Sequence, residues 1–272
     1  MRNQLFMKLK VAVILVSILS GLAIAESNNN QQKASGAALD TIKLIDLADR
    51  QRMLSQRIAK DYLYIGKNIA IEKAKKEMKK SLDELTKSHK ILLESINDPD
   101  IKNLLAFVKM SSEDFKDTAR KKYNLDNAQI ALDLSESMLE GSQYIVDSLK
   151  KKSNIEESGL VAKAGRQRML AQRIAKYYIA YQAGIKDKNT VDQMKRAVKD
   201  FGDVQDLLMQ NPSNTPEINR KLNKINRLWK IVYKFYLNIE KGGLPLIVFN
   251  TTDTITNEMN TVTNMYVKLY QK

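Results

Sequence analysis

Two arginines occupy equivalent places in a segment that occurs twice in this chain. Residues 48–60 read ADRQRMLSQRIAK and residues 164–176 read AGRQRMLAQRIAK, a near identity at a constant offset of 116. At about 100° per residue on a helix, Arg52 and Arg168 fall within a stripe of apolar and small side chains that should face other helices. Because an unpaired buried charge is costly, each guanidinium must have a partner.

That partner can be of two kinds. Two arginines that converge from equivalent helices can clamp a small planar oxyanion, since a guanidinium presents paired N–H donors. Alternatively, each arginine forms a structural salt bridge with a carboxylate on the second, third or fourth helix of a bundle, and no ligand is involved. The other arginines of the motif fall on the opposite side of the helices, where we expect a solvated polar face: Arg50, Arg57, Arg166 and Arg173.

The elements that must position the arginines are long helices. Four prolines and ten glycines among 272 residues leave long stretches of 3.6-residue period, which indicates mostly helix. We expect four helices in each half, at 39–68, 72–96, 99–122 and 126–152, then at 156–184, 188–210, 216–240 and 247–271. The predicted fold class is all-α, with two tandem antiparallel four-helix bundles, 39–153 and 154–272, that form a pseudo-two-fold pair.

The first residues have the pattern of an export signal. A basic MRNQLFMKLK precedes an apolar VAVILVSILSGLAIA with a small-x-small site, so we expect a signal peptide over 1–25 that is cleaved after Ala25. An uncleaved N-terminal anchor is the alternative, although the apolar run is shorter than the ~20 residues that span a bilayer. Residues 26–38 are polar and are expected to form a linker. The expected location is the periplasm.

Charge and composition narrow the classes of function. The formal net charge is +14, or about +11 without the three basic residues of the expected signal peptide. This charge favours anionic ligands or surfaces, and the alternative is lysine spread generally over the surface without a specific partner. Nucleic acid is not expected as a partner, because the aromatic residues are not interleaved with the basic ones as base stacking requires. The sequence has no cysteine, which excludes disulfides and thiolate metal sites. It also has no phosphate loop, metal-ligand spacing or catalytic triad, so we expect a non-enzyme without a metal or cofactor.

The motif AGRQRMLAQRIAK resembles the opening helix of the PilJ-type sensor domain. That domain lies at the N-terminus of type IV pilus chemotaxis transducers and is similar to the periplasmic sensor domain of nitrate/nitrite sensor kinases. The resemblance implies a four-helix bundle per copy, with two tandem copies in this chain. It also implies that an arginine followed by a methionine binds nitrate at the two-fold axis, here Arg52 with Met53 and Arg168 with Met169. The remaining members of the candidate ligand-binding set are their neighbours Gln51, Gln167 and Gly165.

The chain departs from that family in three respects. No transmembrane helix flanks the repeats, and no kinase or methyl-accepting domain accompanies them. Both sensor units are in one chain, so the pair could be intramolecular. Finally, Asp49 stands where the second copy has Gly165. A carboxylate one turn before Arg52 could pair with it and oppose an anion.

We therefore expect a periplasmic ligand-binding or sensory module for chemotaxis or respiration. It would bind a small oxyanion, nitrate or nitrite first, and pass its state to a membrane receptor or a respiratory partner protein. The alternative is a helical interaction or scaffold protein that docks on a membrane receptor or an anionic surface. An open gap between Arg52 and Arg168 would favour the first function. Carboxylates on the second to fourth helices within reach of these arginines would favour the second function. The sequence leaves further homo-oligomerisation open.

Overall fold

The computed structural model describes residues 40–153 and 158–269, and no strand occurs among them. Residues 40–66 form the first helix. The other α-helices are α2 (Ile71–Ser95), α3 (Pro99–Arg120), α4 (Leu125–Ser153), α5 (Ser158–Ala183), α6 (Lys188–Met209), α7 (Pro216–Leu237) and α8 (Pro245–Leu269). The predicted all-α fold class is therefore confirmed. The expected signal peptide, 1–25, and linker, 26–38, lie outside the described residues.

Local sequence signals explain where several helices begin. Asp98 and Thr215 each accept a hydrogen bond at their side chains from the backbone amide three residues later, which satisfies a free N–H of the first turn. Pro99 and Pro216 follow them in the first helical turn, where a missing N–H costs nothing. The predicted starts of both helices are confirmed, and the two halves share this device at an offset of 117.

The prediction of a seventh helix over 216–240 is wrong at its C-terminal end. The α-helix ends at Leu237, and a short 3-10 helix, η1 (Ile239–Lys241), follows it. Gly242 then adopts a φ of 71°, a left-handed conformation that favours glycine and turns the chain toward α8. Helix α8 in turn begins at Pro245, two residues before the predicted start. The Gly-Gly-Leu-Pro sequence marked the break, but its short 3-10 turn was not expected.

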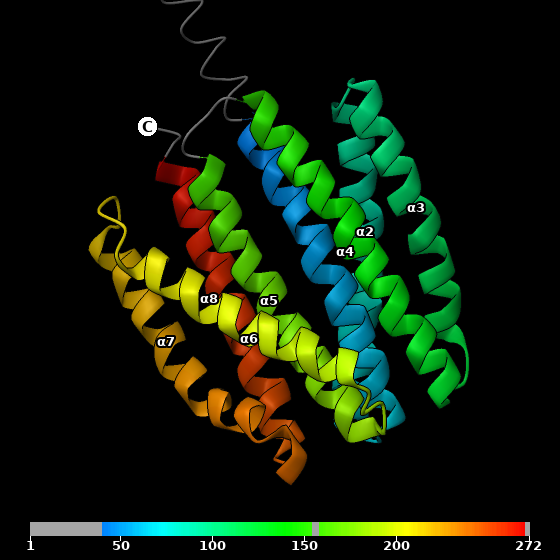
Figure 1. Cartoon of the computed structure of the whole chain (residues 1–272). Helices are drawn as coiled ribbons and strands as arrows, with labels where there is room; N and C mark the ends of the chain where they lie inside the picture. The colour runs from blue at the N-terminus through cyan, green and yellow to red at the C-terminus, as the bar shows by residue number, and fades with distance from the viewer. Residues whose placement is uncertain (1–39, 154–157, 270–272) are drawn as a thin grey trace, which may run out of the picture. The chain divides into compact units, whose positions relative to one another are not determined.

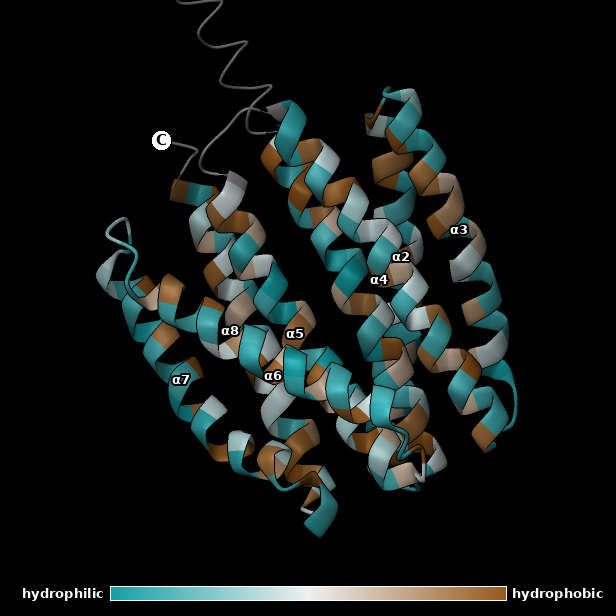
Figure 2. Ribbon diagram, in the orientation of Figure 1, coloured by the Kyte–Doolittle hydropathy of each residue, from teal (hydrophilic) through white to brown (hydrophobic). Residues whose placement is uncertain are grey.

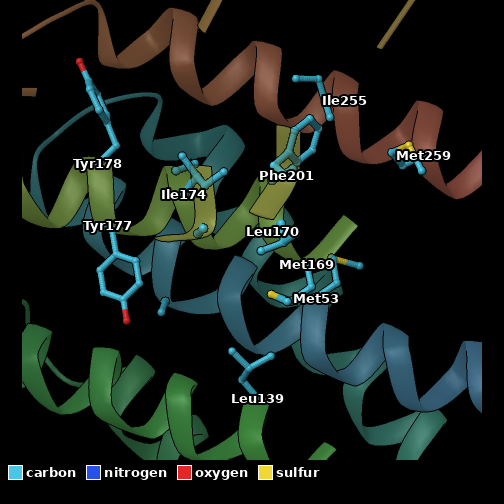
Figure 3. Packing of buried hydrophobic residues seen from close by; sticks show 14 of the residues in the cluster. Met53, Leu139, Met169, Leu170, Ile174, Tyr177, Tyr178, Phe201, Ile255 and Met259 are labelled. Atoms are coloured by element: carbon cyan, nitrogen blue, oxygen red, sulfur yellow. The ribbon is translucent and has the colours of Figure 1, made fainter. Parts of the chain in front are cut away.

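The two halves share a core. Figure 1 shows α5–α8 on one side and the first helix with α2–α4 on the other. Buried side chains of both inner helices, such as Leu54 of the first helix and Leu170 of α5, belong to one hydrophobic cluster. Figure 3 shows part of this cluster, and Figure 2 shows polar residues on the outward turns of the helices. Residues from Ile42 onward accordingly form one compact unit.

Reciprocal ion pairs join the halves. The ammonium of Lys60, on the first helix, lies 2.6 Å from the carboxylate of Asp253 on α8. The ammonium of Lys176, on α5, lies 2.5 Å from the carboxylate of Glu136 on α4. Lys60 and Lys176 are equivalent in the repeat, and so are Glu136 and Asp253 at the offset of 117. Each first helix thus pairs with the last helix of the other half, as a pseudo-two-fold relation requires. The two repeats pair within one chain.

Candidate functional site

The motif arginines are buried, as their place on the helical stripe predicts. Arg52 of the first helix is 2% exposed and Arg168 of α5 is 0% exposed. Ala48 and Ala164, one turn before them, are also fully buried, and their small size lets the two helices approach closely. Both guanidinium groups therefore lie in the interior between the repeats.

Each arginine donates a hydrogen bond to an amide side chain on the last helix of its own half of the chain. Arg52 donates from Nη1 to Oε1 of Gln143 on α4 at 2.6 Å. Arg168 donates from Nη1 to Oδ1 of Asn260 on α8 at 2.9 Å. Gln143 and Asn260 are equivalent at the offset of 117. The amide partners of the arginines thus follow the repeat, and this part of the site is symmetric.

The carboxylates at the site break that symmetry. Asp49 Oδ1 lies 3.0 Å from Arg52 Nη1, and Asp46 Oδ1 accepts a hydrogen bond from Arg168 Nη2 at 2.6 Å. Both acids belong to the first helix. The equivalent positions on α5 are Ala162 and Gly165. The first helix therefore supplies both negative charges, and α5 supplies neither.

Gly165 is required by Asp49. A Cβ atom added to Gly165 would lie 2.0 Å from Asp49 Oδ2, far inside van der Waals contact. Asp49 and Gly165 occupy the same motif position in the two copies, and this position is where the two copies contact each other. The aspartate of one repeat fills the space that the glycine of the other leaves open.

Burial and the neighbouring arginines act on the pKa of Asp49 in opposite directions. Burial raises the pKa of Asp49 to about 6, against the opposing attraction of Arg52 and Arg168. Burial also lowers the pKa of Arg52, although Asp49 opposes this effect. Among the described residues, Nε and Nη2 of Arg52 and Nε of Arg168 donate no hydrogen bond, and Asp49 accepts none, because its contact with Arg52 Nη1 is an ion pair without hydrogen-bond geometry. Buried guanidinium donors that lack an acceptor are costly, so these atoms are candidates for a bound water or anion.

The other predicted ligand-binding residues are placed differently. The Gln167 amide donates to the carbonyl of Phe201 on α6 at 3.0 Å, so it faces the interior of the second bundle and not the arginines. Gln51 is fully buried, and its amide makes no hydrogen bond to the described residues. Met53 and Met169 are both buried in the core that the two halves share, and Figure 3 shows them there. The structure therefore brings together Arg52 and Arg168 but turns Gln167 away.

The expected solvated face is confirmed for Arg166, which is exposed, but is wrong for Arg50, Arg57 and Arg173, which are only partly exposed. Arg173 is largely buried, because α4 covers this side of α5, and its guanidinium pairs with Glu136. Sequence reasoning also missed Gln143 and Asn260 as the amide partners of the arginines. The signal was available, because continuing the offset of 117 through the last helix of each half aligns these two amides.

A cleft reaches the surroundings of the arginine pair. It has a volume of about 610 Å³ and lies between α4, α5 and the start of α6. Its lining includes Gln143, which holds Arg52, and Met169, which follows Arg168. The cleft therefore shares a lining residue, Gln143, with the hydrogen-bond partners of Arg52.

One family comparison bears on this site. The protein-family model named PilJ, described as the N-terminal domain of type IV pili methyl-accepting chemotaxis transducers, matches residues 152–241. No curated protein and no solved structure matches the chain. None of the described helices is long and apolar enough to cross a membrane. Residues 152–241, which include α5 with Arg168, are thus similar to a transducer domain, and this supports a sensory or signalling module and not an enzyme.

Proposed function

We propose that this protein is an exported sensory module that binds a small oxyanion, nitrate or nitrite first, between Arg52 and Arg168. The observation that carries the proposal is the set of unused guanidinium N–H groups from both repeats beside one buried carboxylate. A planar oxyanion accepts such donors with several oxygens at once. The resemblance of the motif to nitrate sensors selects the same two arginines.

Asp49 determines when this anion can bind. As a carboxylate, it neutralises the arginines and repels a second anion. As a neutral acid, it leaves a net positive site and can donate its own hydrogen bond to the ligand. Oxyanion binding would therefore take up a proton at Asp49. The bound anion would tie the first helix to α5, and a membrane receptor or respiratory partner would detect the changed fit between the halves.

A melting series tests the proposal. A ligand that binds only the folded protein stabilises it by about 2.7 kcal/mol at a hundred times its dissociation constant. Nitrate or nitrite, at pH 5.5 and constant ionic strength with chloride as the reference, should raise the melting temperature of the wild type. Arg52→Ala and Arg168→Ala should abolish the shift. Arg220→Ala, at a side chain that is 71% exposed, is the control and should retain it.

One observation favours the alternative function, a helical interaction protein. Asp46 and Asp49 already neutralise the arginines without any ligand. If these are only structural bridges, Arg168→Ala removes the nearer cation of Asp46, leaves Arg50 at 3.9 Å, and should cost the unliganded protein about 3–5 kcal/mol. Such a loss, with no response to any oxyanion in the wild type, would reject the binding proposal in favour of the scaffold.

The proposed export is tested separately. Intact mass measurement of the protein from its native cells should give a chain that begins at Glu26. A chain that keeps residues 1–25 and sediments with membranes would instead make the apolar segment an anchor.

A further inference from the structure

A second concave site lies in the second bundle. It is a groove of about 590 Å³ between α6 and α7, which are adjacent helices in Figure 1. Volumes of this size are typical of sites for small organic ligands. The apolar lining of the groove consists of Met194, Val198, Trp229, Tyr233, Tyr236 and Leu237.

The first bundle lacks this aromatic lining. At the offset of 117, Tyr233 and Leu237 correspond to Lys116 and Arg120. Tyr233 is 39% exposed and Leu237 is 61% exposed, so the second bundle presents apolar surface to solvent where the first presents charge. A four-helix bundle of this kind evidently does not need apolar residues there. Exposed aromatic and aliphatic side chains that line a concave site point to a binding role.

The groove also has free space and an aromatic floor. A Cβ atom added to Gly202 of α6 would meet nothing within 4 Å, whereas the first bundle has Thr86 at the equivalent position. Trp229 stacks on Phe201, with ring centroids 4.2 Å apart, so its ring is held rigidly. The Tyr233 ring lies beside it, at 5.7 Å between centroids. Such rings favour a flat aromatic partner.

The charges at the rim indicate the polarity of the ligand. Lys199 is already paired with Asp203 at 2.5 Å. Lys195 and Lys230 line the groove, and neither forms an ion pair with a described residue. Of the two carboxylates that line the groove, Asp203 is paired with Lys199, and Asp206 forms no ion pair with a described residue. The unpaired charges of the rim therefore sum to one positive charge. An anionic group would be attracted to the two lysines.

We propose that the α6–α7 groove binds a flat aromatic carboxylate, with its ring against Trp229 and Tyr233 and its carboxylate at Lys195 and Lys230. This site is separate from the arginine pair and does not depend on the oxyanion proposal. It would give the sensory module a second input of different chemistry.

Calorimetric titration with 2-naphthoate tests the proposal on the full chain. The wild type should bind 2-naphthoate, and should bind 2-naphthamide and cyclohexanecarboxylate at least several-fold more weakly. Gly202→Leu fills the groove and should weaken binding tenfold or more, whereas the matched Thr86→Leu in the first bundle should not. Tyr233→Lys installs the residue of the first repeat at an exposed position and should also weaken binding tenfold, which keeps the test valid if Gly202→Leu does not fold.

The position of the ligand can be read directly. Trp229 is the only tryptophan, so 5-fluorotryptophan labelling gives a single fluorine resonance, which 2-naphthoate should shift. Arg168→Ala should leave this shift unchanged. Absence of binding, binding that Tyr233→Lys does not weaken, or a fluorine resonance that does not move would overturn the groove as the site. Equal affinity for 2-naphthamide would overturn the carboxylate as the ligand class.

Discussion

Titration of Asp49 should control the affinity of the arginine site for nitrate. Its pKa of about 6 lies above its usual value because the group is buried. We assume that nitrate binds only when Asp49 is neutral. At pH 7, which is one unit above the pKa of Asp49, binding then requires that this carboxylate is first protonated. One pKa unit corresponds to about 1.4 kcal/mol, or a factor of ten. The dissociation constant should therefore be roughly tenfold larger at pH 7 than its limiting value below pH 6, and roughly a hundredfold larger at pH 8.

The charges around Asp49 fix the direction of this dependence. The groups that act on its pKa besides burial are Arg52, Arg168, Asp46 and Lys150. Burial is the largest of these influences, and the resulting pKa of about 6 places the titration of Asp49 within this pH range. Because its folded pKa is raised, its contribution to folding stability is complete below pH 4 and is lost as the pH rises through about 6. Asp49→Asn should accordingly gain stability over the wild type as the pH rises from 4 to 7.

Calorimetric titration with nitrate between pH 5 and 8 measures the effect. Above pH 6, the dissociation constant of the wild type should rise about tenfold for each pH unit. At pH 7 the wild type should take up close to one proton per bound nitrate, which is measured by repeating the titration in buffers of different ionisation enthalpy. Asp49→Asn should bind with an affinity that does not vary with pH. Asp83→Asn, an exposed carboxylate on α2, should behave as the wild type. A wild-type affinity that does not vary with pH, or an equal slope in Asp49→Asn, would refute the reasoning.

Three further substitutions have definite expected outcomes in urea unfolding experiments. Gly165→Ala forces a Cβ against Asp49 and should cost about 1–3 kcal/mol. The added change Asp49→Gly should restore most of this loss, and Gly159→Ala, where the Cβ has open space, should cost nothing. Glu136→Gln leaves two cations without their carboxylate and should cost about 3–5 kcal/mol. Burial raises the pKa of Asp61 to about 8, so Asp61→Asn should stabilise the protein increasingly as the pH rises from 4 to 8, and a loss at pH 8 would contradict this.

The helices were predictable because their signals are local. Helical periodicity and the prolines at 99 and 216 placed most ends within a few residues of those observed. The burial of Arg52 and Arg168 could also be predicted from the sequence of each helix alone, because a stripe of small residues marks the face that packs against other helices. These properties depend on neighbours along the chain and not on which helix lies opposite.

The partners of the arginines could not be predicted in the same way. A helical wheel gives the direction of Arg168 but not the helix that it meets, so Asp46 of the other repeat was not identified. The burial of Arg173 was missed for the same reason, because the wheel does not show that α4 covers it. Such contacts depend on how the halves cross, which the sequence of one helix does not specify.

Duplication within one chain explains how the site acquired its asymmetry. In a symmetric homodimer every residue near the axis occurs twice, so an aspartate at this position would face another aspartate. A Cβ atom added to Gly165 would overlap Asp49 Oδ2, so even an alanine opposite Asp49 forces one of the two helices or the aspartate to shift. Covalent linkage of the repeats lets one copy carry the acid while the other keeps the glycine. The two positions therefore act as one unit, and an aspartate of one copy packed against a glycine of the other is an arrangement that this duplicated chain can hold and a symmetric pair cannot.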